Sequence, residues 1–381
     1  MILRIIVFFT AIFLFLLSNL VLAQDKSGPP KDKKWKGKGE VIEFQSMPIL
    51  TVKDFLNGVV PEKRNTIWGT LNFPDSAADK NVPVVVILHG MSGVHEAEEH
   101  WLKIINSMGI ATFMVDSNWG RKKCKKDSNL KKDIKWCAAA NRGVNRVIDG
   151  YGALELLSNH PRIDPKRIGC IGNSLGARGC LYLNVKRFQK MWGTPGLEYA
   201  ASVPMYPPCN VTYKEDDEIT DTPIRIHVGE LDTYFPVDSC VNYVTRLKAK
   251  GKDVDIKVYP DTHHSFETKT GGKKTMKIRD HNDGRCYYEE NPSLPVAEMA
   301  PDDVAIISQI GFNEWYASAT EKEKKKIFKR VKMRHKMGWR LPQFQYDNSC
   351  VSKSNTLAYN KDSSEEAEKL VREFFTATLI K

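Results

Sequence analysis

Residues 167–177 read Arg-Ile-Gly-Cys-Ile-Gly-Asn-Ser-Leu-Gly-Ala. A short apolar run leads into Gly-Asn-Ser-Leu-Gly, and a helix-compatible segment follows. This order is typical of a nucleophile elbow, in which a buried strand turns sharply into a helix and holds the middle serine in a strained conformation. Gly172 and Gly176 suit such a turn, because a side chain at either position would collide with the neighbouring strand or helix. The stretch therefore predicts that Ser174 is a nucleophile.

Strand and helix patterns alternate on both sides of this turn. Residues 82–88 form a continuous apolar run, as in a strand that is buried on both faces. The alternation predicts an α/β fold with a mainly parallel sheet flanked by helices. The other predicted strands are residues 41–44, 66–73, 110–115, 167–172, 197–205, 223–228 and 254–259, and the predicted helices are residues 96–108, 138–159, 237–250 and 363–375.

A serine nucleophile needs a base, and the base needs an orienting acid. Two loops that follow predicted strands downstream of Ser174 supply them: Gly-Glu-Leu-Asp at residues 229–232, and Pro-Asp-Thr-His-His-Ser-Phe at residues 260–266. The order serine, acid, histidine is that of the α/β hydrolases. Neighbours in an extended loop point to opposite sides, so only one of each pair can face the serine. The candidates are Glu230 or Asp232 for the acid, and His263 or His264 for the base.

A Gly-rich loop follows the apolar strand at residues 82–88 and reads His-Gly-Met-Ser-Gly at residues 89–93. In this position it is typical of an oxyanion loop. The backbone N–H of Met91 would join that of Leu175, directly after the nucleophile, to hold the developing negative charge; such a donor contributes about 3–4 kcal/mol in comparable sites. The alternative is a plain Gly-rich turn between a strand and a helix.

These motifs resemble those of the exported, serine-dependent members of the dienelactone hydrolase family of α/β hydrolases. In that family the acid takes the last place of the Gly-Glu-x-Asp turn, and the histidine precedes a small residue and then Phe, so the resemblance implies Asp232 and His264. The dienelactone hydrolases proper use a cysteine, so Ser174 argues against dienelactone as the substrate while ester hydrolysis remains expected. The resemblance covers residues 41–379 and is carried by residues 89–94, 115–117, Arg121, 162–169, 229–232 and 264–266.

The function that follows is that of a secreted serine hydrolase, which cleaves small carboxylic esters through an acyl-enzyme intermediate. No metal or cofactor is expected, because the histidines lack ligand spacings and the cysteines lack Cys-x-x-Cys pairs. Three alternatives remain open. They are a serine peptidase of the same fold, a carbohydrate acetyl-esterase, and a non-catalytic exported binding protein.

The first 23 residues have the composition of a secretory signal peptide. Arg4 gives a positive start, residues 5–17 form an apolar core, and Ala23 precedes the expected cleavage point. Export to the periplasm or the medium follows from this prediction, and an uncleaved membrane anchor is the alternative. Residues 24–40 are rich in Lys, Gly and Pro and predict a flexible basic lead-in. Residues 41–381 are then the hydrolase domain.

The chain is basic, with a formal charge of +11 that falls to +10 when the leader and its Arg4 are removed. Between the histidine loop and the last helix lies an insertion at about residues 267–360. Within it, residues 321–340 contain ten Lys or Arg against two Glu, and Thr320 to Glu323 form a capping box that opens a helix. This segment predicts attraction to an anionic surface or polymer, with a merely solvated helix as the alternative. No nucleic-acid module accompanies it, so no specific nucleic-acid partner is expected.

Eight cysteines remain after removal of the leader, and an even number in an exported chain predicts disulfides. Two pairs are expected, one bracketing a lysine-rich loop with little apolar content to hold it and the other bracketing the later insertion. They are Cys124 with Cys137 and Cys286 with Cys350. Cys170, in the strand before Ser174, and Cys180, in the helix after it, are expected to be buried unpaired thiols.

Overall fold

The computed structural model describes residues 39–48, 50, 52–118, 121, 143–269, 272–282, 285–290, 307–336, 343–344, 346–347 and 349–381. The predicted signal peptide, most of the basic lead-in and the predicted Cys124–Cys137 pair lie outside these residues. The described residues belong to one compact unit, Lys38–Lys381.

An eight-stranded sheet runs through this unit in the order β1-β2-β4-β3-β5-β6-β8-β9. The first two strands are antiparallel to their neighbours, and all the later pairs are parallel. The α/β-hydrolase fold with a mainly parallel sheet is therefore confirmed, and each predicted strand is present. The strands are β1 (Glu40–Ser46), β2 (Asn65–Asn72), β3 (Val82–Leu88), β4 (Ala111–Asp116), β5 (Ile163–Asn173), β6 (Ala201–Met205), β8 (Ile224–Gly229) and β9 (Val254–Tyr259).

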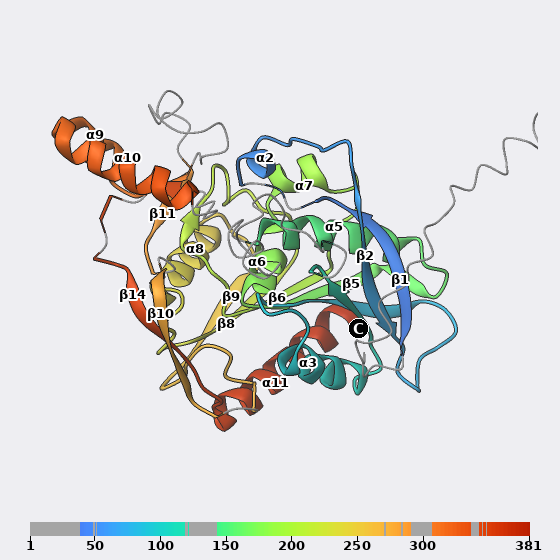
Figure 1. Cartoon of the computed structure of the whole chain (residues 1–381). Coiled ribbons are helices and arrows are strands. Elements are labelled where there is room, and N and C mark those ends of the chain that lie inside the picture. Colours follow the sequence, from blue (N-terminus) through green and yellow to red (C-terminus); the bar gives the residue numbers. More distant parts are fainter. Residues whose placement is uncertain are drawn as a thin grey trace, which may run out of the picture. The chain divides into compact units, whose positions relative to one another are not determined.

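Helices cover both faces of the sheet, α3 and α11 on one and α5, α6 and α8 on the other (Figure 1). The central strand β3 is almost entirely buried, as its continuous apolar run predicts. Val84, Val86 and Leu88 point toward the α5 side of the sheet. Val85 and Ile87 alternate with them along the strand and therefore point to the opposite side. The helices are α2 (Val52–Leu56), α3 (Glu96–Asn106), α5 (Val144–Ser158), α6 (Leu175–Tyr182), α7 (Lys186–Trp192), α8 (Val237–Ala249), α9 (Phe312–Ser318), α10 (Glu321–Lys336) and α11 (Lys361–Phe375), with a π-helical end at Thr376–Ile380.

The insertion after the histidine loop forms structure that periodicity did not predict. Strand β10 (Lys274–Asn282) pairs with β14 (Ser352–Leu357), so the insertion leaves and returns along one antiparallel ladder. A second small sheet has the order β13-β12-β11-β7, in which β7 (Val211–Thr212) belongs to the main body. The other three strands are β11 (Tyr288–Glu290), β12 (Ile307–Gln309) and β13 (Gln343–Phe344).

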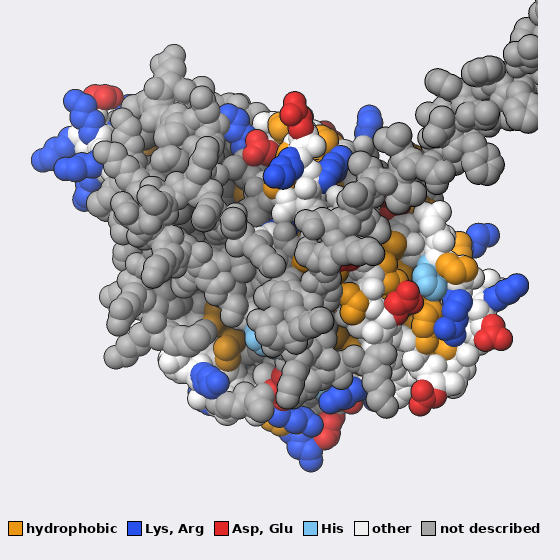
Figure 2. Space-filling view, turned by 45° about the vertical axis from the view of Figure 1, so that its right-hand side comes forward, with side chains coloured by type: hydrophobic (Ala, Val, Ile, Leu, Met, Phe, Trp, Pro, Cys, Tyr) orange, Lys and Arg blue, Asp and Glu red, His pale blue; other side chains and the backbone are white. Residues whose placement is uncertain are grey.

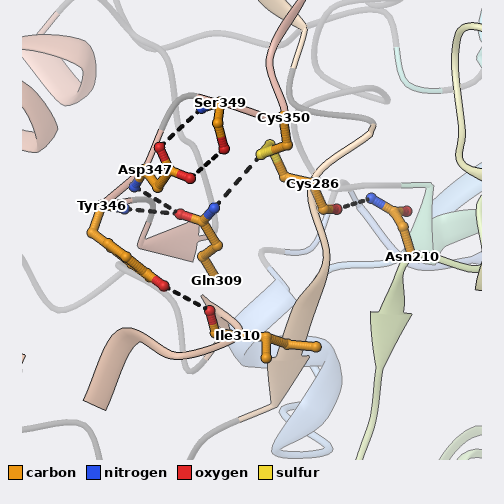
Figure 3. Close-up of a disulfide and its surroundings, with 8 residues drawn as sticks. All are labelled: Asn210, Cys286, Gln309, Ile310, Tyr346, Asp347, Ser349 and Cys350. Carbon is orange, nitrogen blue, oxygen red and sulfur yellow. Dashed lines mark hydrogen bonds between the residues drawn. A yellow bond between two sulfur atoms is a disulfide. The ribbon is translucent and has the colours of Figure 1, made fainter. Parts of the chain in front are cut away.

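A disulfide between Cys286 and Cys350 joins the early and late parts of this insertion, and it confirms the predicted pair. Figure 3 shows its surroundings: the side chain of Asn210 donates to the Cys286 carbonyl at 2.8 Å, and that of Gln309 donates to Cys350 Sγ at 3.6 Å. Near β11, Arg187 forms an ion pair with Glu290 at 2.7 Å. The contacts of Asn210 and Arg187 attach the insertion to the α/β body.

The prediction that the two cysteines near the elbow, Cys170 and Cys180, are unpaired is wrong. Cys170 on β5 and Cys180 on α6 form a disulfide, with Cα atoms 5.7 Å apart and both side chains fully buried. The reason is the sharp reversal at Ser174, which brings the end of the strand against the helix that follows it. A further disulfide joins Cys209 to Cys240 of α8.

Two helix starts were predicted from capping signals, with different outcomes. The capping box of α10 is present, since Thr320 N–H donates to Glu323 Oε2 at 2.8 Å and Glu323 N–H donates to Thr320 Oγ1 at 3.3 Å. Helix α11 begins two residues earlier than predicted, at Lys361, because the Asn360 side chain caps it by accepting from Ser363 N–H. Among the helices that the structure describes, none is both long enough and apolar enough to cross a membrane.

Candidate functional site

The elbow has the backbone that its sequence predicts. Ser174 has φ 54° and ψ −113°, outside the ordinary regions for a residue with a side chain. A Cβ built on Gly176 would lie 1.9 Å from the Leu88 carbonyl oxygen, and one on Gly172 would lie 2.4 Å from the Gly176 backbone. Only glycine fits at these two positions. The turn therefore places Ser174 at the carboxyl end of β5, beside the end of β3.

The three predicted side chains meet at this place. His264 Nε2 lies 3.1 Å from Ser174 Oγ, and His264 Nδ1 lies 2.7 Å from Asp232 Oδ2. The other carboxylate oxygen of Asp232 accepts the backbone N–H groups of Tyr234, at 2.7 Å, and Phe235, at 3.2 Å. The second oxygen is thereby held, so the carboxylate can orient the imidazole with its Nε2 toward the serine.

The two competing residues face elsewhere. His263 is directed to the Leu231 carbonyl, with Nδ1 2.9 Å from that oxygen, and Glu230 accepts the Asp261 N–H at 3.2 Å. His264 itself is buried. The alternation along the loop thus separates the two histidines, as expected for neighbours in an extended segment.

The histidine loop is supported by the strand that returns from the insertion. Leu357 forms a parallel bridge with His264, and Asn360 N–H donates to the Phe266 carbonyl at 3.0 Å. On the acid side, the β14 residue Thr356 donates its N–H to the Thr233 hydroxyl at 2.8 Å. The insertion therefore ends in direct contact with the loops that carry His264 and Asp232.

The loop after β3 lies against the elbow. A Cβ on Gly90 would be 3.6 Å from Ser174 Cβ, so the backbone that leads to Met91 runs beside the serine. Leu175 is the first residue of α6, where backbone N–H groups have no partner within the helix. Met91 is partly exposed, at 37%. Both predicted oxyanion donors thus belong to backbone segments next to Ser174.

A buried carboxylate fixes this loop. Glu98 of α3 accepts Gly90 N–H at 3.2 Å and His95 N–H at 2.9 Å, one with each oxygen. Burial raises the pKa of Glu98 to about 7, and the two backbone hydrogen bonds oppose that shift. The ionised carboxyl is the form that accepts both N–H groups.

The raised pKa of Glu98 makes stability depend on pH. An unfolded Glu loses its proton near pH 4.3, whereas the folded protein keeps it to about pH 7, so stability falls as the pH rises through this window. Because Gln cannot titrate, the free energy of unfolding of the wild type relative to Glu98→Gln should fall by about 2 kcal/mol between pH 5 and pH 8. Urea unfolding of both proteins at the two pH values measures this. Glu99→Gln, on the same helix, should follow the wild type; a wild-type pH dependence in Glu98→Gln would contradict the prediction.

The histidine at the start of the loop has a structural role. His89 is fully buried, its Nδ1 lies 2.6 Å from the Gly90 carbonyl oxygen, and its Nε2 accepts Ser117 N–H at 3.1 Å. Burial and the nearby charge of Arg146 lower the pKa of His89 well below its usual value. Arg146 in turn donates to the His89 carbonyl at 3.1 Å. The neutral ring therefore shapes the loop and carries no charge.

Comparison with models of protein families identifies the family of this chain. Residues 67–285, more than half of the chain, match the model of the dienelactone hydrolase family. The chain belongs to the dienelactone hydrolase family. It is accordingly a hydrolase of that family, and no curated protein matches it.

Solved structures whose titles name dienelactone hydrolases or esterases are similar to this chain at low identity. The structure titled m3DLH is 13% identical, covers 90% of this chain and 100% of its own, and has a TM-score of 0.49. A dienelactone hydrolase-like promiscuous phosphotriesterase, P91 from metagenomic libraries, is 15% identical over 61% of this chain and 86% of its own, at a TM-score of 0.44. The butyrate-bound esterase Est2 of Thermogutta terrifontis is 13% identical over 52% of this chain and 80% of its own, at a TM-score of 0.40.

Several residues around this candidate site were not predicted from the sequence. The imidazole of His264 lies between two aromatic rings, Tyr206 at 4.4 Å and Tyr234 at 4.5 Å between centroids. Two further carboxyls are buried nearby, that of Glu98 on the Gly90 N–H and that of Glu267 on the Tyr206 hydroxyl. Tyr206 directly follows β6, and that position at a strand end was the one available signal. In the described part of the chain, no group of three or more His, Cys, Asp or Glu could hold a metal ion.

Proposed function

We propose that this protein is a serine esterase that acts on small carboxylic esters through Ser174, His264 and Asp232. The observation that carries the proposal is the unbroken contact from serine to imidazole to carboxylate, at 3.1 and 2.7 Å. His264 Nε2 takes the Ser174 proton as Oγ attacks the ester carbonyl, and Asp232 stabilises the resulting imidazolium. His264 then protonates the departing alkoxide, and water releases the acid from the acyl-enzyme by the same route.

The negative charge that forms on the carbonyl oxygen needs hydrogen-bond donors. We assign this role to the backbone N–H groups of Met91 and Leu175, with Glu98 holding the first loop through Gly90. No metal or cofactor has a part in this scheme.

The experiment is an assay of short-chain p-nitrophenyl esters against a panel of unrelated peptides and acetylated sugars. Rapid turnover of the simple esters supports the proposal. Faster cleavage of peptides or of acetylated sugars would favour the peptidase or the carbohydrate acetyl-esterase. No turnover of any substrate would favour the non-catalytic binding protein.

We also propose that the protein is exported and cleaved near Ala23. Three disulfides among the described residues support an oxidising compartment, periplasmic or extracellular. Sequencing the amino terminus of protein purified from the native host tests this, and a terminus at Met1 would reject cleavage.

We infer that helix α10 binds an anionic lipid surface. Its sequence contains nine Lys or Arg and two Glu, and Figure 2 shows cationic side chains gathered at the end of the molecule where α10 lies. Lys324 already has partners within the protein. Its Nζ lies 3.2 Å from Glu321 Oε1 and 4.6 Å from the centroid of the Tyr316 ring. Four other lysines of the helix are exposed and are the residues that we assign to binding: Lys322, Lys325, Lys326 and Lys329.

Replacing these four lysines with Gln should weaken binding to anionic vesicles about a thousandfold, since each Lys near such a surface contributes about 1 kcal/mol. Wild-type binding should also weaken as salt rises from 50 to 500 mM, because the Debye length shortens. Co-sedimentation with anionic and neutral vesicles measures both effects.

A matched variant replaces four exposed lysines of the main body, Lys80, Lys103, Lys166 and Lys190, with Gln. It has the same net charge as the α10 variant and should bind like the wild type. Equal binding by the two variants, or equal binding of the wild type to neutral vesicles, would show that α10 is only a solvated helix.

A further inference from the structure

A second buried carboxylate lies behind the site, on the histidine loop itself. Glu267 is three residues after His264 and is only 1% exposed. Its Oε1 accepts two hydrogen bonds, one from the side-chain amide of Asn173 and one from the hydroxyl of Tyr206. Asn173 directly precedes Ser174, and Tyr206 directly follows β6. One carboxylate oxygen therefore joins the elbow, the end of β6 and the histidine loop.

This oxygen fixes the ring that backs the imidazole. Tyr206 has φ 43°, an uncommon backbone for a residue with a side chain, and its N–H donates to the His227 carbonyl at 2.6 Å. At the other end of the ring, the Asn173 amide also donates to the Tyr206 hydroxyl, at 2.7 Å. Held at both ends, the ring packs against His264 with its centroid 4.4 Å away. A change at Glu267 would thus reach His264 through Tyr206.

The surroundings of Glu267 raise its pKa overall, because burial outweighs the neighbouring groups that favour the ionised form. Burial raises the pKa of Glu267, and the Tyr206 hydroxyl, the charge of His264 and the indole of Trp101 lower it. The Trp101 contact is a weak one, because neither its N–H nor Glu267 Oε2 completes a hydrogen bond of standard geometry within the described residues. The other acid that faces this group is Glu98 of α3, whose pKa the charge of Glu267 raises.

We propose that Glu267 is a positioning residue that holds Tyr206 and Asn173 around His264 and, as a buried anion, stabilises the positive charge that His264 acquires. The inference rests on the proposed ester hydrolysis. In that reaction Ser174 Oγ bonds to the carbonyl carbon, its proton moves to His264 Nε2, and the carbonyl electron pair moves to oxygen. Glu267 gives and takes no proton. It acts on the imidazolium through the low-dielectric interior, where a charge is poorly screened.

The test is Glu267→Gln, which keeps the size of the side chain and an oxygen that can accept from Asn173 and Tyr206. We expect kcat to fall about tenfold with little change in KM. Since the anion that favours the protonated imidazole is gone, the acidic limb of the kcat/KM profile should move to lower pH by about half a unit. Carbon-13 NMR of His-labelled protein should show the same downward change in the His264 titration midpoint, and this readout needs no substrate.

Two further variants separate charge from shape. Glu267→Asp keeps the charge and shortens the side chain, so kcat should fall while the His264 midpoint stays near that of the wild type. Glu366→Gln removes an exposed carboxylate that pairs with Lys257 on the surface, and both readouts should be unchanged.

An unchanged His264 midpoint in Glu267→Gln would overturn the inference whether or not activity falls, because loss of packing alone would leave that midpoint in place. If Glu267→Gln does not fold, a His264 midpoint in Glu267→Asp that lies about half a unit below that of the wild type would overturn it, because that variant keeps the charge. Failure of the wild type to hydrolyse any ester would instead reject the proposed function, and the NMR comparison would still test the role of Glu267.

Discussion

Ser174→Ala is expected to reduce ester hydrolysis by about 10⁴- to 10⁶-fold while the protein stays folded. The substitution removes the atom that forms the acyl-enzyme. It should leave the backbone of the elbow in place, because Gly172, Gly176 and the disulfide between Cys170 and Cys180 are untouched. Hydrolysis rates measure the loss of activity, and thermal unfolding shows whether the variant is folded.

A fluorophosphonate probe supplies an independent check on this expectation. The wild type should be labelled and Ser174→Ala should not, since the probe reacts with an activated serine hydroxyl. Labelling that persists in the folded variant would move the nucleophile to another residue. As a control, Ser92→Ala in the loop after β3 should label like the wild type.

His264→Ala is expected to lower kcat/KM by about 10⁴-fold or more, whereas His263→Ala should lower it by less than about tenfold. His264 is buried and touches both Ser174 and Asp232, while His263 is directed to the Leu231 carbonyl of the acid loop. The two variants form a matched pair, because they remove the same side chain from adjacent positions. Parallel kinetic assays on both proteins measure the difference.

The result that would contradict this assignment is an equal loss in both variants with both proteins folded. Circular dichroism and unfolding midpoints establish whether both proteins are folded. Added imidazole offers a positive control, since it can partly restore a missing base in His264→Ala but has no corresponding role in His263→Ala.

The main sheet and the elbow were predictable because their signals are local. The apolar run at β3 and the two glycines around Ser174 each follow from short-range sterics or from burial on both faces. The order of the serine, the acid and the histidine was equally visible, since each follows a predicted strand. The choice of His264 over His263 depended on the family resemblance, because alternation alone does not say which neighbour faces inward.

The parts that escaped prediction depend on contacts between distant segments. The ladder of β10 with β14 pairs residues about 80 positions apart, and neither strand has a strong pattern of its own. Cys170 and Cys180 were expected to be unpaired because a strand and a helix usually separate their side chains, yet the elbow reverses the chain within a few residues. Glu98 and Glu267 resemble any other acid in the sequence, and only burial distinguishes them.

The return of β14 to the histidine loop has a consequence for the order of folding. Leu357 bridges His264, and Asn360 donates to the Phe266 carbonyl, so the support of the imidazole comes from residues that follow the whole insertion. During synthesis the nucleophile and both its partners emerge long before this strand does. Pairing across such a sequence separation is slow compared with the formation of local helices. The nascent chain therefore reaches the final geometry of this site only after residues 352–360 have left the ribosome.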